Sequence, residues 1–186
     1  MTTTLTTLLR VFDETNPHVP LLQTGDGSRI AQELASIGVR FERWAADAHL
    51  APGADQAAVV EAYRSSIERL QNECGYRSVD VIRLERGTPN TDPIRKKFLD
   101  EHRHSEDEVR FFVEGRGAFY LHVGSRVYQT ICVRGDLISV PAGTTHWFDM
   151  GPDPEFTAIR LFVNPDGWVA NFTGSPIAQA FPKLDA

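Results

Sequence analysis

The sequence predicts a mainly β protein in which a barrel or sandwich of short strands carries helices on its outside. From residue 108 onward, runs of β-branched and aromatic residues are separated by Gly or by Pro-Ala-Gly, at the spacing of an all-β barrel or sandwich. The first half instead alternates strand-like and helix-like segments. The 186 residues contain no internal repeat, linker or low-complexity segment, so we expect one domain spanning residues 1–186.

The amino-terminal half supplies the expected helices. Strand-like runs lie at 5–14, 39–44 and 79–86, and a segment punctuated by Pro and Gly predicts a loop at 16–27. A first helix is expected at 28–38, with Ser28 as its cap. A longer helix at 55–75 places apolar side chains three and four residues apart along one stripe. A short helix or turn, capped by Asp92, is expected from there to residue 101.

The carboxyl-terminal half supplies the expected strands, at 108–115, 117–124, 126–135, 136–143, 146–151 and 155–163. The composition of the whole chain argues against several classes of binding partner. A net charge of −6 and a pI near 5.5 argue against binding to nucleic acid or to an anionic membrane. The first residues lack the features of a signal peptide, and Cys74 and Cys132 are read as free thiols. We expect a cytoplasmic protein, and a monomer because no long exposed apolar stripe stands out.

Four residues form a candidate metal site. His102 and His104 lie two apart, Glu108 follows four residues later, and His146 stands after Gly135-x5-Pro141-x-Gly143. Side chains of one parity share a face of an extended segment, so the two histidines would point one way. Pro and Gly turns before His146 would swing it back across the mouth of the barrel. The combined spacing favours a metal site, whereas a single histidine is more often a surface or satisfied core residue.

The chemistry of the expected metal stays open at this point. Three imidazoles and one carboxylate suit Fe(II), Ni(II), Mn(II) or Zn(II) better than an ion that prefers thiolates. On an octahedral ion they leave two positions for a substrate that chelates through two oxygens. Zinc usually takes four ligands as a complete tetrahedral set, which would make the site structural.

Two arginines accompany this motif. Arg110 shares its parity with Glu108, which favours a role in the pocket over that of a solvated strand charge. Arg160 lies among apolar residues of the same parity, where a guanidinium is costly unless it meets an anion. The sequence leaves two alternatives open for that anion, with neither favoured: a ligand bound in the pocket, or the carboxylate of a structural ion pair.

These residues resemble the two motifs of the cupin superfamily, His102-x-His104-x3-Glu108-x6-Gly115 and Gly135-x5-Pro141-x-Gly143-x2-His146. The resemblance implies a double-stranded β-helix, or jelly-roll barrel. Two positions depart from the pattern: Lys96 replaces a usual Gly, and Met150 replaces a usual Asn. Both changes concern turns and leave the four ligand positions intact.

Over residues 96–168 the chain also resembles the acireductone dioxygenase family of the bacterial methionine salvage pathway, through KFLDEHRHSEDEVRFFVEGRGAFYLHV, VPAGTTHWFDMG and FTAIRLFVNPDGW. This resemblance implies that one Fe(II) or Ni(II) ion is bound by the four residues named above, and that Arg110 helps to form and hold the substrate dianion. It implies a pocket lined by Phe98, Phe148, Arg160 and Trp168.

The implied reaction is the oxidative cleavage of an acireductone, an enediol with an adjacent carbonyl and a methylthio tail, by O2. The family's iron form gives the 2-oxo acid and formate, and its nickel form gives carbon monoxide, formate and methylthiopropionate. Glu108, or a neighbour outside the ligand set such as Glu101 or Asp107, would take the first proton. Two other functions stay open: a different small-molecule cupin enzyme, and a metal-stabilised binding domain without turnover.

Overall fold

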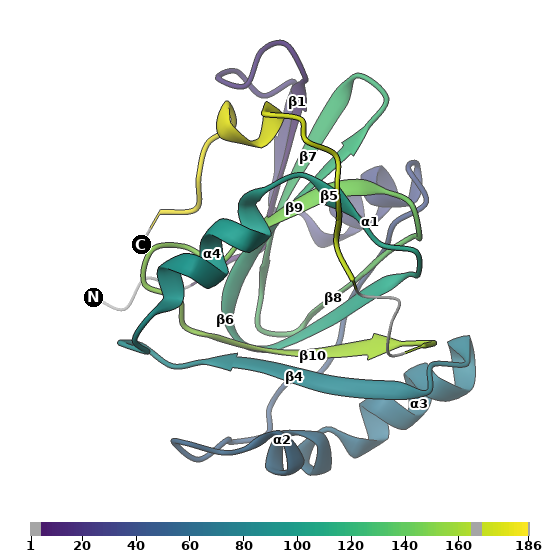
Figure 1. Cartoon of the computed structure of the whole chain (residues 1–186). Coiled ribbons are helices and arrows are strands. Elements are labelled where there is room, and N and C mark those ends of the chain that lie inside the picture. The colour runs from purple at the N-terminus through teal and green to yellow at the C-terminus, as the bar shows by residue number, and fades with distance from the viewer. Residues whose placement is uncertain (1–4, 165–168, 186) are drawn as a thin grey trace.

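Helices and strands alternate in the first half of the chain, and strands dominate the second. The computed structural model describes residues 5–164 and 169–185 (Figure 1). Its helices are α1 (Gly27–Ala35), α2 (Gln56–Ala62), α3 (Arg64–Cys74), α4 (Thr91–Leu99) and the 3-10 turn η1 (Ile177–Gln179). Its strands are β1 (Leu8–Asp13), β2 (Leu22–Thr24), β3 (Arg40–Arg43), β4 (Ser78–Leu84), β5 (His102–Arg103), β6 (Glu108–Val123), β7 (Arg126–Val133), β8 (Asp136–Val140), β9 (Thr145–Asp149), β10 (Phe156–Phe162) and β11 (Asn171–Phe172). The expected mainly β class with peripheral helices is confirmed.

The strands form one antiparallel sheet with two halves that share β6. One half has the order β11-β5-β9-β6-β7-β1-β2, and the other has the order β4-β10-β6-β8-β3. Residues 108–111 of β6 pair with β8, whereas residues 118–122 pair with β9. β6 therefore links the two halves, and the two strands expected at 108–115 and 117–124 are one bent strand.

The bend in β6 lies at Gly115. This residue has a φ of +65°, and a Cβ added there would lie 1.8 Å from the carbonyl oxygen of Glu155. A side chain is excluded on both counts. Phe112 before the bend and Phe119 after it belong to the same core cluster, although their numbers differ in parity. The pairing of β6 with β10 also shifts register by one residue at Val113, between Phe112 and Glu114. This bulge and the bend together exchange the two faces of the strand.

Apolar residues fill the space between the halves and cover both outer faces. The interior cluster draws on both halves, with Leu9, Phe112, Phe119, Ile138, Phe148 and Ala158 among its members. Helices α2 and α3 cover the half that contains β4 and β10 (Figure 1), through Val59, Ile67 and Leu70 packed with Val109, Phe111 and Ile159. The carboxyl-terminal segment covers the other half, where Phe181 and Leu184 join Tyr120 and Trp147.

Several local expectations need correction. The helix expected at 55–75 is interrupted at Tyr63, whose backbone (φ −116°, ψ 22°) leaves the helical region while its ring packs edge-on against Phe111 at 5.7 Å. Asp26 caps α1 in place of Ser28, and accepts a hydrogen bond from the backbone of Arg29 at 2.7 Å. The short strands β2, β5 and β11 lack the length of pattern that would predict them. Among the described residues, no helix is long and apolar enough to span a membrane.

Candidate metal centre

Three histidines meet where β5, β9 and the start of β6 come together. His102 in β5 pairs directly with His146 in β9, and their rings lie 4.5 Å apart. His104 follows β5, with its ring 5.0 Å from that of His102 and 5.2 Å from that of His146. One nitrogen from each ring lies within 4.8 Å of the other two. The spacing expected from the sequence therefore becomes a cluster in space.

Backbone carbonyls fix the orientation of the three rings. The Nδ1 atoms of His102 and His146 lie 2.7 Å and 2.8 Å from the carbonyl oxygens of Asp100 and Thr144, and Nδ1 of His104 lies 3.2 Å from that of Val169. A carbonyl only accepts, so each Nδ1 carries the hydrogen of this bond. In a neutral ring Nε2 is then the free electron-pair donor, as a metal ligand requires.

Glu108 completes the cluster. Its Oε2 lies 2.8 Å from Nε2 of His146 and 3.4 Å from Nε2 of His104. A carboxylate oxygen and an unprotonated imidazole nitrogen both offer lone pairs, so at this distance they need a cation between them, either a proton or a metal ion. Burial alone would raise the pKa of Glu108, but the positive charge of Arg110, and after it the contacts with His104 and His146, hold the pKa well below its usual range. Glu108 is therefore an anion in the interior.

The donor set fits a borderline divalent metal. Burial, and then the proximity of His146, lower the pKa of His102 to about 4, which keeps this ring neutral near pH 7. Metal–nitrogen bonds of about 2.1 Å place two donors of one ion no more than about 4.2 Å apart. Donor atoms within 4.8 Å of one another need only a small closure to meet that limit.

Arg110 lies beside Glu108 in an aromatic seat. Its Nε and Nη2 donate to Oε1 of Glu108 at 2.8 and 2.7 Å. Its guanidinium carbon lies 4.3 Å from the ring centre of Phe148, 5.0 Å from that of Phe119 and 5.7 Å from that of Phe98. Nη1 is buried and has no hydrogen-bond partner among the described residues. This aromatic seat, formed by Phe98, Phe119 and Phe148, surrounds the guanidinium of Arg110 and leaves its Nη1 without a hydrogen-bond acceptor among the described residues.

The other pocket residues expected from the sequence separate into three groups. Phe98 and Phe148 face each other edge-on at 6.1 Å beside Arg110. Arg160 of β10 forms a bidentate ion pair with Asp80 of the neighbouring strand β4, at 2.8 and 2.5 Å. This contact supports the alternative in which Arg160 belongs to a structural ion pair. Trp168 lies outside the described residues.

The two additional carboxylates make structural contacts. Glu101 is buried, with Oε2 2.8 Å from Nδ1 of His122 and Oε1 2.7 Å from the hydroxyl of Thr173. Asp107 is exposed and accepts a hydrogen bond from the backbone of Ala142 at 2.9 Å, so it supports the turn before His146. Because both carboxylate oxygens of Glu101 already contact protein groups, His122 and Thr173, Glu101 is poorly suited to take a proton from a substrate.

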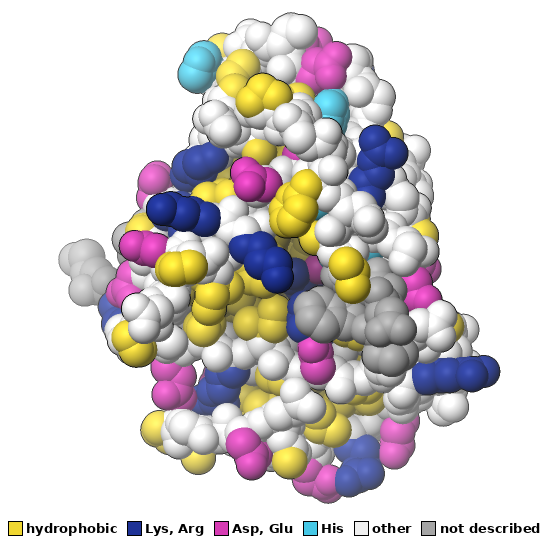
Figure 2. Space-filling model, in the orientation of Figure 1, with side chains coloured by type: hydrophobic (Ala, Val, Ile, Leu, Met, Phe, Trp, Pro, Cys, Tyr) yellow, Lys and Arg dark blue, Asp and Glu magenta, His cyan; other side chains and the backbone are white. Residues whose placement is uncertain are grey.

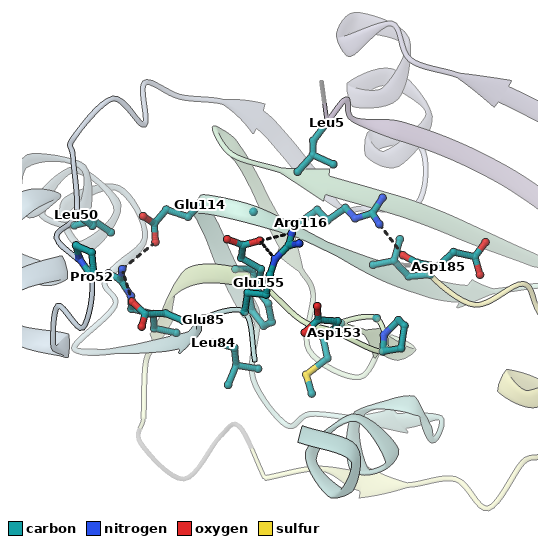
Figure 3. Close-up of a pocket in the computed structure, with 18 residues that line it drawn as sticks. Leu5, Leu50, Pro52, Leu84, Glu85, Glu114, Arg116, Asp153, Glu155 and Asp185 are labelled. Carbon is teal, nitrogen blue, oxygen red and sulfur yellow. Dashed lines mark hydrogen bonds and ion pairs between the residues drawn. The ribbon is translucent and has the colours of Figure 1, made fainter. Parts of the chain in front are cut away.

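Two features of the structure bear on substrate access. Figure 2 shows hydrophobic side chains lining a hollow between α4 and β10, in line with the barrel interior. A cavity of about 1130 Å³ lies around Gly115 and includes none of the three histidines in its lining, and Figure 3 shows ion pairs among several of its charged side chains. Arg86 meets Glu155, and Nη2 of Arg83 reaches both Glu85 and Glu114. Arg116, which also lines this cavity, donates to the backbone carbonyl of Asp185.

Three contributors were not expected from the sequence: Phe119 in the aromatic seat, Gly117 beside it, and His122 behind Glu101. Phe119 has the opposite parity to Arg110, and the bend at Gly115 brings them to one face. If the sequence had shown that the strand reverses its faces near Gly115, Phe119 would have been predicted to lie beside Arg110. No sequence signal links His122 to Glu101.

Comparison with known proteins agrees with this geometry. Residues 9–170 match the model of the ARD/ARD' family. The chain is 60% identical to an acireductone dioxygenase of Stenotrophomonas maltophilia (strain K279a) over 94% of this chain and 95% of that one. For a relative of the same name from Parvibaculum lavamentivorans, the identity is 56% over 97% and 98%.

A solved structure supports the fold. An acireductone dioxygenase from Bacillus anthracis, with a cadmium ion in its active centre, matches with a TM-score of 0.77 at 29% identity, over 90% of this chain and 98% of that one. The cupin class expected from the two motifs is thereby confirmed. With a family model that covers most of its length and relatives of this identity, the chain belongs to the acireductone dioxygenase family of enzymes.

Proposed function

We propose that this chain cleaves 1,2-dihydroxy-3-keto-5-methylthiopentene with O2 in methionine salvage. One Fe(II) or Ni(II) ion per chain would be held by His102, His104, Glu108 and His146. The observation that carries the proposal is the approach of Nε2 of His146 and Nε2 of His104 to an anionic Glu108 directly beside the buried Arg110. A site for a structural ion would not need a buried guanidinium with an unused donor.

The side chains suit the substrate at two points. When bound, the ion supplies Lewis acidity, which lowers the cost of a doubly deprotonated enediol. Arg110 adds a fixed positive charge in a site of low dielectric, where it favours the same dianion. The faces of Phe98 and Phe148 would hold the methylthio tail and exclude water. The enediol would thus meet charge at one end and apolar surface at the other.

The bound metal would decide the products. We propose that the iron form yields 4-methylthio-2-oxobutanoate and formate, and that the nickel form yields methylthiopropionate, formate and carbon monoxide. One set of imidazole and carboxylate donors accepts both ions, so metal supply would select the outcome.

The test is to strip the protein of metal, reload it separately with Fe(II) or Ni(II), and supply the acireductone in air. Decay of the enediol absorbance is expected with both ions, and carbon monoxide in the headspace with nickel alone. Protein that is fully loaded yet leaves the enediol at the uncatalysed rate would contradict the proposal, and would favour another cupin enzyme or a binding domain.

The remaining expectations concern the molecule as a whole. We propose that residues 1–186 form one domain, because β6 contributes to all three apolar clusters. We also propose a cytoplasmic monomer. Size-exclusion chromatography with light scattering would give about 21 kDa for a monomer, from a chain mass of 20.8 kDa.

A further inference from the structure

Gly117 lies where the aromatic seat meets the backbone of β6. A Cβ added there would lie 2.4 Å from Cζ and 2.7 Å from Cε2 of Phe148, and 3.3 Å from Cε1 of Phe112. The φ of Gly117 lies outside the left-handed range, unlike that of Gly115. The conflict at Gly117 is therefore with side chains and not with backbone conformation.

The pairing of β6 with β9 explains this close approach. Phe119 is directly opposite Phe148 on β9, and Gly117 is two residues before Phe119 on the same face. The ring of Phe148 leans diagonally across the pair and covers the bare glycine. In that position its face lies 4.3 Å from the guanidinium carbon of Arg110, the shortest of that group's three aromatic contacts.

Phe148 has little freedom to move elsewhere. It is 1% exposed and contacts the rings of Phe98, Phe112, Phe119 and Phe156 at centroid distances of 5.0 to 6.4 Å. Interiors packed at this density do not absorb an added methyl group without displacing a neighbour. A methyl group at residue 117 would therefore push the ring of Phe148 toward Arg110, or turn it away from its present plane.

We propose that Gly117 is a positioning residue for the reaction: its missing side chain lets the Cζ–Cε2 edge of Phe148 approach β6 closely, so that the ring holds the guanidinium of Arg110 in place. This inference rests on the proposed function. It adds that the correct placement of Arg110 depends on the absence of a Cβ at residue 117, as well as on the ion pair with Glu108.

The test compares Gly117→Ala with Phe148→Leu and with the double variant, each assayed per bound metal. Gly117→Ala should retain metal, because the four donors do not contact residue 117. Its kcat should fall by about 10²-fold, since a displacement of about 1 Å has that effect on catalytic geometry, while KM changes little. In the double variant the smaller leucine relieves the conflict, so its kcat should equal that of Phe148→Leu alone.

Two controls separate positioning from loss of stability. Gly27→Ala makes the same change where the nearest side-chain atom is 3.8 Å away, and should keep full activity. Ile67→Ala lowers stability through the cluster under α3, far from the seat, and should also keep its kcat.

The outcomes are distinct. Full kcat in Gly117→Ala, or multiplied losses in the double variant, would overturn the inference. If Gly117→Ala does not fold, the double variant should, and failure of both would show that Phe148 is not the obstacle. An inactive wild-type protein would instead refute the proposed function.

Discussion

At the scale of single residues, Arg110 is the clearest case of a charge made acceptable to an apolar interior. It is 3% exposed and sits on strand β6 among phenylalanines, so water contributes little to its solvation. Two hydrogen bonds to Glu108 and three aromatic faces replace that water. Removing one member of such a buried pair costs about 3 to 5 kcal/mol when the other charge is left alone. A metal ion on Glu108 would reduce that cost.

Arg110→Ala should therefore retain metal and lose most turnover. We expect kcat to fall by about 10²- to 10³-fold, the effect of removing one charged or hydrogen-bonding group from a reacting oxyanion. Arg110→Lys keeps the positive charge but not the two-point contact with Glu108, and should recover part of the loss. Elemental analysis and the decay of enediol absorbance measure the two quantities. Full turnover of the alanine variant would remove Arg110 from the mechanism.

At the scale of elements, β6 determines which side chains share the site. Glu108, Arg110 and Phe112 face inward before Gly115, and Phe119 and Leu121 face inward after it. Alternation predicts each run correctly by itself. It does not predict that the runs join, because the reversal depends on a one-residue bulge at Val113 and on a left-handed glycine against the backbone of residue 155.

Gly115→Ala should be among the most destabilising substitutions in the chain. It combines an unfavourable left-handed backbone with overlap of the Glu155 carbonyl, for a loss of about 2 to 5 kcal/mol in the free energy of unfolding. Gly124→Ala is the matched control, since its φ is +61° and nothing lies within 4 Å; it should lose only about 1 to 2 kcal/mol. Denaturant unfolding compares them. Equal losses would show that the contact with Glu155 contributes nothing.

The short strand β5 depends on hydrogen bonds from outside its own ladder. The imidazole of His122 lies between the carboxylates of Glu101, just before β5, and Glu14, just after β1, at 2.8 and 2.9 Å. Partial burial opposes a charge on His122, but these two partners outweigh it and raise its pKa. The charged imidazole thus fastens the segment that carries His102 to the main sheet.

The stabilising effect of His122 should depend on pH with a definite sign. Because its pKa is raised on folding, the contribution is fully present below the ordinary value of 6.5 and is lost as the pH rises through the raised value. The difference in free energy of unfolding between metal-free wild type and His122→Gln should shrink as the pH rises from about 6 to 8. A difference that is constant with pH would show that folding does not raise the pKa of His122.

At the scale of the whole molecule, local pattern predicted the donors better than their surroundings. His102, His104 and Glu108 lie within one short segment, and turn residues precede His146, so spacing alone predicts them as candidate donors, and the structure brings the three histidines together. The partner of Arg160 is Asp80, eighty positions earlier, and only the pairing of β10 with β4 brings them together. The carbonyls that orient the three rings carry no sequence signal, because every residue has one.

The metal should stabilise the whole fold, because its donors join β5, the start of β6 and β9. Binding to the folded state alone at about 100 times the dissociation constant adds about 2.7 kcal/mol, or about 5 to 10 °C in Tm for a chain of this size. Scanning calorimetry of the protein before and after treatment with a chelator measures this loss, and reloading should reverse it. His146→Ala removes the donor from β9 and should abolish most of the metal-dependent rise. If that variant gains as much from the metal as the wild type does, the ion does not bind between these strands.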